Sequence, residues 1–170
     1  MFTPKVLVVN VHAAGLSAPD SLLLPDHGSN AYELMSAASR EEALRQVREH
    51  EFAVILLNAG TPGIDCPELA EAIHSQPHSA SVPIIFIGAC LSDETDELKG
   101  YQKGAVDYLF APVIPQILQA KVSLFIELAR KNLQLQRQAR ETAELNQALQ
   151  LQRKHDLQYI AERQQVEAAL

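Results

Sequence analysis

The stretch VILLNAGTPGID, residues 54–65, decides the fold of this 170-residue chain. An apolar run that begins at Phe52 continues through it to Leu57, and a turn rich in Gly and Pro follows Asn58. A strand that is apolar on both faces is typical of a parallel sheet covered by helices on both sides. The sequence therefore predicts a buried strand over Phe52–Leu57.

Similar segments lie on both sides of this strand. Helical patterns with a polar face alternate with the apolar runs, and Ser39-Arg40-Glu41-Glu42 forms a capping box that opens one of the helices. This alternation predicts an α/β fold with a five-stranded parallel sheet. The other strands are expected over residues 5–9, 32–37, 82–87 and 106–110. Helices are expected over residues 39–50, 67–74 and 92–103, with a short or distorted helix near residues 19–24.

The last third of the chain has a different character. No Gly or Pro follows Pro115, so nothing stops a helix that would run about 84 Å if continuous to residue 170. Such a helix exposes an apolar stripe and is poorly stabilised alone, so a parallel homodimer through it is predicted. Polar residues interrupt the seven-residue spacing, so the heptad is not strict. The residues expected near the dimer axis are Leu128, Leu135, Leu145 and Leu149.

Composition excludes several classes of protein. Apolar residues are 47% and charged residues 21%, as in a packed domain, and the net charge of -7 argues against a nucleic-acid surface. No apolar run is long enough to cross a membrane, and no signal peptide is evident. Two cysteines, Cys66 and Cys90, cannot form a disulfide scaffold, and reduced thiols in a cytoplasmic protein are expected.

Five motifs in order resemble a response-regulator receiver domain, the CheY-like form of the flavodoxin-like fold. Besides the stretch from Val54 to Leu57, they are Lys5-Val6-Leu7-Val8-Val9, the turn Pro62-Gly63-Ile64-Asp65, the strand Pro83-Ile84-Ile85-Phe86-Ile87, and Gly104-Ala105-Val106-Asp107-Tyr108-Leu109 followed by Pro112. The resemblance implies strand order 2-1-3-4-5. It places a receiver-like domain at residues 1–128 and a helical coiled-coil linker at residues 129–170.

The residues that carry receiver chemistry are replaced. By the resemblance, Asn58 stands where the family phosphorylates an aspartate, and a neutral amide cannot form the acyl phosphate. Asn10 and Val11 stand where two acids hold Mg²⁺, which requires charged oxygen ligands. Gly88 replaces the switch Ser/Thr and Ala111 replaces the lysine. The resemblance therefore implies a degenerate pseudo-receiver with no catalytic residue, metal or cofactor.

Two further positions match the family. Tyr108 is the switch aromatic by resemblance, although a half-buried strand tyrosine is an equal alternative on composition. Gly88 beside it leaves room for the ring in the inner position. The resemblance also implies a cis peptide bond between Ala111 and Pro112.

Other polar residues are expected to have no chemical role. His12 is expected in a surface loop, Asp65 is expected to point outward, and Cys66 and Cys90 are expected to be small core or loop residues. Pro77 separates His74 from His78, so both histidines are expected in a loop.

These observations predict a phosphorylation-independent signalling module of a bacterial phosphorelay. The pattern over residues 164–170 resembles a linker before a PAS or kinase module, so the N-terminal part of a multidomain sensor kinase or response regulator is expected. A signalling protein could bind the face formed by helix 4, strand 5 and helix 5. The alternative is a small-ligand-binding or enzymatic domain that uses the crevice at the strand ends. The net charge of -7 disfavours a DNA-binding regulator.

Overall fold

The computed structural model describes residues 3–9, 32–58, 65–88, 105–110 and 113–169. By their internal contacts the residues form two units, one over Met1–Arg130, called the receiver unit after the resemblance stated above, and one over Lys131–Leu170, called the stalk unit. Within the described residues, no helix is both long enough and apolar enough to span a membrane.

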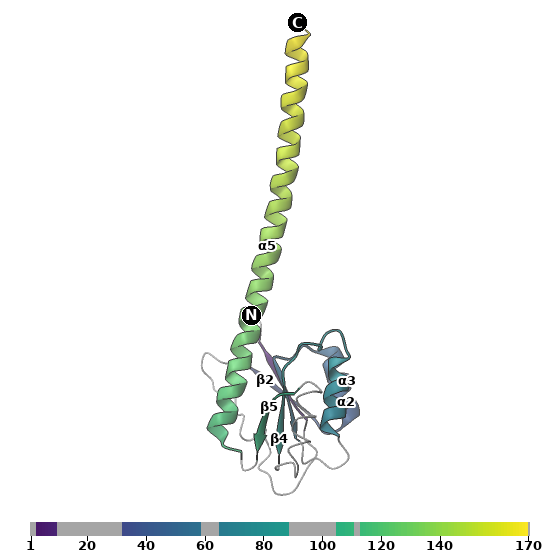
Figure 1. Ribbon diagram of the computed structural model, residues 1–170, viewed down its shortest axis with the longest axis vertical. Coiled ribbons are helices and arrows are strands. Elements are labelled where there is room, and N and C mark those ends of the chain that lie inside the picture. The colour runs from purple at the N-terminus through teal and green to yellow at the C-terminus, as the bar shows by residue number, and fades with distance from the viewer. Residues whose placement is uncertain (1–2, 10–31, 59–64, 89–104, 111–112, 170) are drawn as a thin grey trace. The chain divides into compact units, whose positions relative to one another are not determined.

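The receiver unit is built on one parallel sheet (Figure 1). Its strands lie in the order β2-β1-β3-β4-β5, so the α/β, flavodoxin-like fold and the predicted strand order are confirmed. The connection from β2 to β3 crosses over β1, which places β1, β3 and β4 at the centre of the sheet. The strands are β1 (Lys5–Val9), β2 (Glu33–Ala37), β3 (Val54–Asn58), β4 (Ile84–Gly88) and β5 (Ala105–Phe110).

Alternate residues of the central strands fill two separate cores, one on each face of the sheet. Because successive side chains of a strand point to opposite faces, Leu7, Ile55 and Leu57 face one core while Val8 and Leu56 face the other. Both sets are buried, which explains why these strands are apolar without interruption. The continuous apolar runs therefore reflect helices on both faces.

Helices α2 (Arg40–Glu49) and α3 (Cys66–His74) cover the first face (Figure 1). The predicted capping box begins α2: the Ser39 hydroxyl oxygen accepts a hydrogen bond from the Glu42 N–H at 3.2 Å. The Glu42 carboxylate in turn accepts one from the Ala38 N–H at 2.9 Å. Both hydrogen bonds determine where α2 begins after β2. The apolar side of α2 packs on the sheet through Ala43 and Val47.

The first turns of α5 (Pro115–Ala168) cover the second face. Leu118, Val122 and Ile126 recur every four residues and are buried against the apolar residues of β1, β3 and β4. The later part of α5, in the stalk unit, has no buried residue among those described. One helix thus completes the receiver core and also forms the stalk.

The predicted strands and helices that fall on described residues are confirmed, with ends shifted by at most two residues. The shifts arise because an apolar run marks burial, whereas a strand is defined by its hydrogen bonds: Phe52 is buried but precedes β3. The expected loop position of His74 is wrong, because His74 is the last residue of α3. Its Nε2 lies 2.8 Å from the Val82 carbonyl oxygen. The expected helices near 19–24 and over 92–103 lie outside the described residues.

Candidate functional site

The candidate site lies at the carboxyl ends of the parallel strands, where this class of sheet binds its ligands. Asn58 ends β3, Gly88 ends β4 and Phe110 ends β5. The sheet register pairs Asn58 with Ile87 and Gly88 with Phe110, so these residues follow one another across the sheet edge. Asn58 is only 4% exposed, which places a neutral amide, not a carboxylate, at the buried centre of this edge.

Cys66, the first residue of α3, contacts Asn58, the last residue of β3. Its thiol donates a hydrogen bond to the Asn58 carbonyl oxygen, with Sγ and O 3.5 Å apart. Burial, with a smaller contribution from the negative charge of Asp65, raises the pKa of the Cys66 thiol to about 12. The thiol therefore stays protonated at neutral pH and supports the end of β3 instead of acting as a nucleophile.

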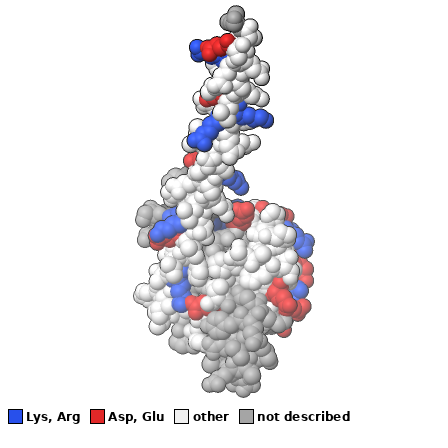
Figure 2. Space-filling model, turned by 45° about the horizontal axis from the view of Figure 1, so that its top comes forward, with Lys and Arg blue, Asp and Glu red and all other residues white. Residues whose placement is uncertain are grey.

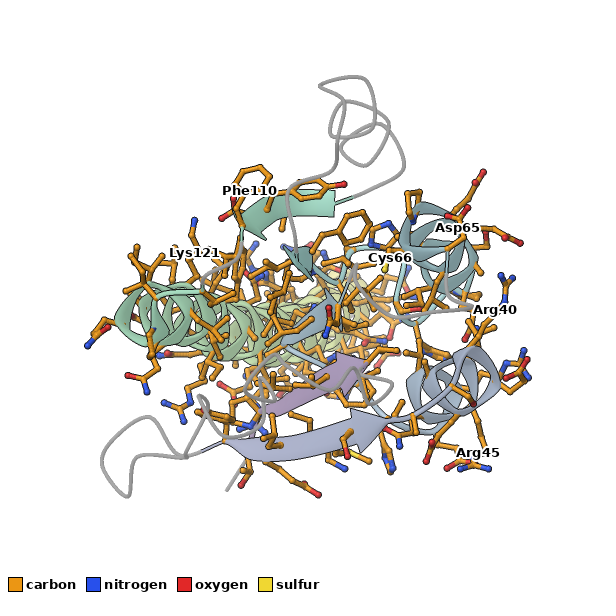
Figure 3. All side chains as sticks on the ribbon, turned by 90° about the horizontal axis from the view of Figure 1, so that it is seen from below. Arg40, Arg45, Asp65, Cys66, Phe110 and Lys121 are labelled. Atoms are coloured by element: carbon orange, nitrogen blue, oxygen red, sulfur yellow. The ribbon has the colours of Figure 1, made fainter. Side chains whose placement is uncertain are left out.

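Asp65 is the acidic residue next to this edge, and it serves as a helix cap. Its carboxylate accepts a hydrogen bond from the Glu68 N–H at 3.0 Å and so begins α3. The side chain is exposed, and Figure 3 shows it at the outer end of α3. Asp65 thus points outward, as expected, and its carboxylate is engaged with α3.

Tyr108 occupies an inner position beside the site. Its ring is buried and packs edge-to-face on Phe86, with ring centroids 5.0 Å apart and an interplanar angle of 87°. It also stacks on the ring of Phe110, with ring centroids 6.1 Å apart and an interplanar angle of 17°. Phe110 is itself largely exposed and is labelled at the end of β5 in Figure 3. Ring contacts therefore link the buried Phe86, through Tyr108, to the exposed Phe110.

An ion pair fastens β5 to α5. Lys121 of α5 binds the Oδ2 atom of Asp107, and the Asp107 Oδ1 atom accepts a hydrogen bond from the Tyr108 N–H at 2.8 Å. Both side chains are about one third exposed, at 33% and 27%, so solvent screens the pair only in part. Asp107 thus links the backbone of the Tyr108 strand to the helix that forms the stalk.

Comparison with known proteins identifies the family to which this architecture belongs. The response regulator receiver domain family matches residues 6–123, which is most of the receiver unit. The chain belongs to this family. It therefore carries a receiver domain of two-component signalling, with the CheY-like fold that the motifs implied.

Curated relatives of this receiver are longer proteins. A probable cyclic di-GMP phosphodiesterase of Vibrio cholerae is 30% identical over 114 residues, which are 66% of this chain and 26% of that protein. The transcriptional regulatory protein AfsQ1 of Streptomyces coelicolor is 33% identical over 91 residues, 54% of this chain and 39% of that protein. The chain thus spans only about a quarter to two fifths of the length of these relatives, as it does for the ycf27 regulators at 36% and 41%.

Solved receiver structures agree with the fold. A response regulator of Chloroflexus aurantiacus is 28% identical with a TM-score of 0.62, covering 74% of this chain and 99% of that chain. The receiver domain of the sensor histidine kinase PA1611 of Pseudomonas aeruginosa, solved with a magnesium ion in its active-site cleft, is 23% identical with a TM-score of 0.60. It covers 74% of this chain and 99% of its own. At that identity the likeness shows the fold alone.

The structure brings together three of the residues that the sequence singled out. Asn58, Gly88 and Tyr108 lie on the neighbouring strands β3, β4 and β5. Asn10, Val11, Ala111 and Pro112 lie outside the described residues, and so does the predicted cis peptide bond. In the part of the chain that the structure describes, no three His, Cys, Asp or Glu side chains gather where they could hold a metal ion.

Three features of the site were missed by the sequence. They are the bond from Cys66 to Asn58, the ion pair of Asp107 with Lys121, and the stacking of Phe110 on Tyr108. The first two join residues 8 and 14 positions apart, and no local pattern signals such contacts. Only the stacking of Phe110 on Tyr108 had a signal in the sequence, because side chains two residues apart in a strand point to the same face.

Proposed function

We propose that this receiver signals without being phosphorylated. The observation that carries the proposal is Asn58, which ends β3 and is buried at the position where, by resemblance, the family carries its phosphorylated aspartate. A neutral amide has no anionic oxygen to attack a phosphoryl donor. Gly88, at the end of β4, offers no hydroxyl to bind the phosphoryl group.

The other components of phosphoryl transfer are absent by the sequence match. The transfer needs a divalent cation to offset charge and donors to hold the phosphoryl oxygens, besides the attacking aspartate. Asn10 and Val11 match the cation-binding acids, and Ala111 matches the lysine. Because these losses act on different requirements, restoring one residue should not restore the reaction.

The test is intact mass after incubation with acetyl phosphate and Mg²⁺. We expect no added phosphoryl group on the natural chain or on Asn58→Asp. We expect phosphorylation to return only when Asn10→Asp, Val11→Asp, Asn58→Asp, Gly88→Thr and Ala111→Lys are combined, provided that circular dichroism shows this variant folded. A phosphoryl group on the natural chain, on Asp65 or elsewhere, would overturn the proposal. Localised amide shifts of Asn58 on Mg²⁺ titration would also contradict it.

Output is proposed to pass through a parallel homodimer of α5. Leu128, Leu135, Leu145 and Leu149 recur at positions of one heptad and are all exposed large apolar side chains. A helix of 54 residues with such a stripe is stabilised by a partner helix. At micromolar concentration we expect sedimentation at about 37 kDa, twice the chain mass of 18.7 kDa.

Leucine-to-glutamine substitutions test this dimer. Leu145→Gln and Leu149→Gln should shift sedimentation toward the monomer, since glutamine keeps helix propensity while removing the apolar contact. Leu151→Gln is the matched control, because Leu151 is similarly exposed but lies off the heptad line. A natural chain that stays monomeric would overturn the stalk dimer.

The curated relatives support a role as one part of a longer protein. In each of these relatives, more than half of the protein's length lies outside the region that matches this chain. We infer that this chain is the N-terminal part of a multidomain sensor kinase or response regulator, with α5 joining the receiver to the output module. The exposed Val106 and Phe110 on β5 would suit a signalling partner at the neighbouring face.

A further inference from the structure

The part of α5 that belongs to the receiver unit has a second apolar side besides the one that packs on the sheet. Leu118, Val122 and Ile126 are buried, whereas Ile117 and Leu124 are 44% and 63% exposed. Leu128 follows on the same line and is 50% exposed. Spacings of seven and four residues place these three side chains on one face of the helix, so α5 offers an apolar seam that the receiver core does not use.

Lys121 lies on the line of this seam, four residues after Ile117 and three before Leu124. At such a position in a symmetric dimer, two ammonium groups would meet near the two-fold axis and repel. Here each lysine is bound by Asp107 of its own chain. Figure 3 shows Lys121 between α5 and β5, the strand that carries Asp107. The positive charge is therefore neutralised within the subunit.

We propose that a second copy of this chain packs in parallel against the seam of Ile117, Lys121, Leu124 and Leu128, with Asp107 neutralising the lysine. The inference rests on the proposed α5 dimer and extends that interface into the receiver unit. The two-fold axis places identical positions opposite one another, so apolar residues meet apolar residues. The occupant is a second copy because the same heptad positions continue at Leu135, Leu145 and Leu149 on the same helix.

The charges that flank the seam favour the same partner. In a parallel pair, Glu127 and Glu141 face Asn132 and Asn146 of the other helix at the neighbouring flanking positions, so no like charges are opposed at these four positions. Lys131 continues the line of the seam after Leu128, so the apolar contact is interrupted there. The area also suffices. Six half-exposed apolar side chains offer on the order of 600 Å² per chain, which is the lower end of the range for a stable interface.

Asp107 gives this interface a link to the candidate site. Its Oδ1 atom accepts the Tyr108 N–H while its Oδ2 atom binds Lys121. Any change in β5 that separates Asp107 from Lys121 leaves a bare ammonium group in the seam and weakens the dimer. The state of the Tyr108 strand is thereby coupled to subunit association without a phosphoryl group.

The first experiment is sedimentation equilibrium of the full chain carrying Leu124→Gln. The matched control is Leu151→Gln, since the two leucines are exposed to 63% and 64% but only Leu124 lies on the seam. We expect Leu124→Gln to raise the dimer dissociation constant about tenfold or more and Leu151→Gln to leave it within about twofold. Circular dichroism and urea unfolding verify that each variant is folded.

The second experiment isolates the charge. Asp107→Asn should weaken the dimer about tenfold, because Lys121 loses its counter-charge while Asn keeps an acceptor for the Tyr108 N–H. Lys121→Met should strengthen the dimer. In the Lys121→Met background Asp107→Asn should have no effect on association, which a purely structural role of Asp107 does not predict.

The outcomes separate the two proposals. A natural chain that is monomeric at all concentrations overturns the α5 dimer altogether. A dimer that Leu145→Gln dissociates, but that Leu124→Gln and Asp107→Asn leave unchanged, overturns this inference alone. An equal effect of Asp107→Asn with and without Lys121 also overturns it.

Discussion

Cys66 shows how a single residue at the site is kept chemically inert. It occupies the first position of α3, where a helix N-terminus usually favours a thiolate. Burial and the neighbouring Asp65 oppose this effect and raise its pKa to about 12, against an ordinary value of 9.0. The desolvation of the charged form therefore outweighs the helix dipole, and the thiol acts as a buried donor to the Asn58 carbonyl oxygen.

This pKa predicts a loss of stability in alkali. The folded state keeps the Cys66 proton between about pH 9 and 12 while the unfolded chain releases it, so the free energy of unfolding falls as pH rises through this window. At pH 10 the loss is about 1 kcal/mol relative to pH 8. Urea unfolding of the natural chain and of Cys66→Ser as a function of pH measures this loss. The difference between the two pH profiles gives the contribution of Cys66 alone. Parallel pH profiles for both chains would contradict the assignment.

Capping residues determine where individual helices begin. The Ser39 hydroxyl accepts the Glu42 N–H, so Ser39→Ala should lower the free energy of unfolding by about 1 kcal/mol. Ser75→Ala is the control, because the Ser75 hydroxyl donates to the Glu71 carbonyl oxygen at the exposed end of α3 and caps no N–H group. Its effect should stay within about 0.5 kcal/mol. If both substitutions lower the free energy of unfolding equally, the Ser39 cap does not stabilise α2 more than an ordinary surface hydrogen bond does.

Burial divides α5 into a part that stabilises the receiver and a part that does not. Leu118 is fully buried against the sheet, so Leu118→Ala should cost about 2–5 kcal/mol through lost burial and the cavity left behind. Leu151→Ala, at an exposed leucine of the same helix, should change stability by less than about 0.5 kcal/mol. Thermal or urea unfolding of the two variants decides whether α5 is an integral part of the receiver core.

Patterns along the chain were sufficient to predict the elements but not the contacts between them. The central strands β1, β3 and β4 were predictable because both of their faces are buried, and α2 because Ser39 and Glu42 carry a local signal. Asn58 could be placed at the end of β3 for the same reason. The pairing of Asp107 with Lys121 could not be predicted, since it depends on how α5 packs beside β5.

At the scale of the whole chain, charge is distributed unevenly. Residues 1–114 carry six basic and fifteen acidic side chains, whereas residues 115–170 carry eight basic and six acidic ones. On the receiver unit, acidic and basic side chains are interspersed in the view of Figure 2, which shows no extended basic patch there. Association through α5 is therefore expected to depend on apolar contact more than on net charge.

An α5 dimer makes thermal unfolding depend on protein concentration. Because association stabilises the folded state by mass action, the unfolding midpoint should rise by about 2 °C for each tenfold increase in chain concentration. Differential scanning calorimetry over two decades of concentration measures this slope. Leu149→Gln should flatten it, whereas Leu151→Gln should preserve it, and a natural chain with no slope would argue against obligatory dimerisation.

The burial pattern of α5 also bears on how such proteins evolve. Beyond Arg130 no described residue of the helix is buried, so codons can be gained or lost there without disturbing the receiver core. The number gained still matters, because each residue turns the helix by about 100°. Seven added residues return the far end of the helix to nearly its former direction, whereas two or five do not. We therefore expect natural length variants of this helix to differ mainly in steps of seven.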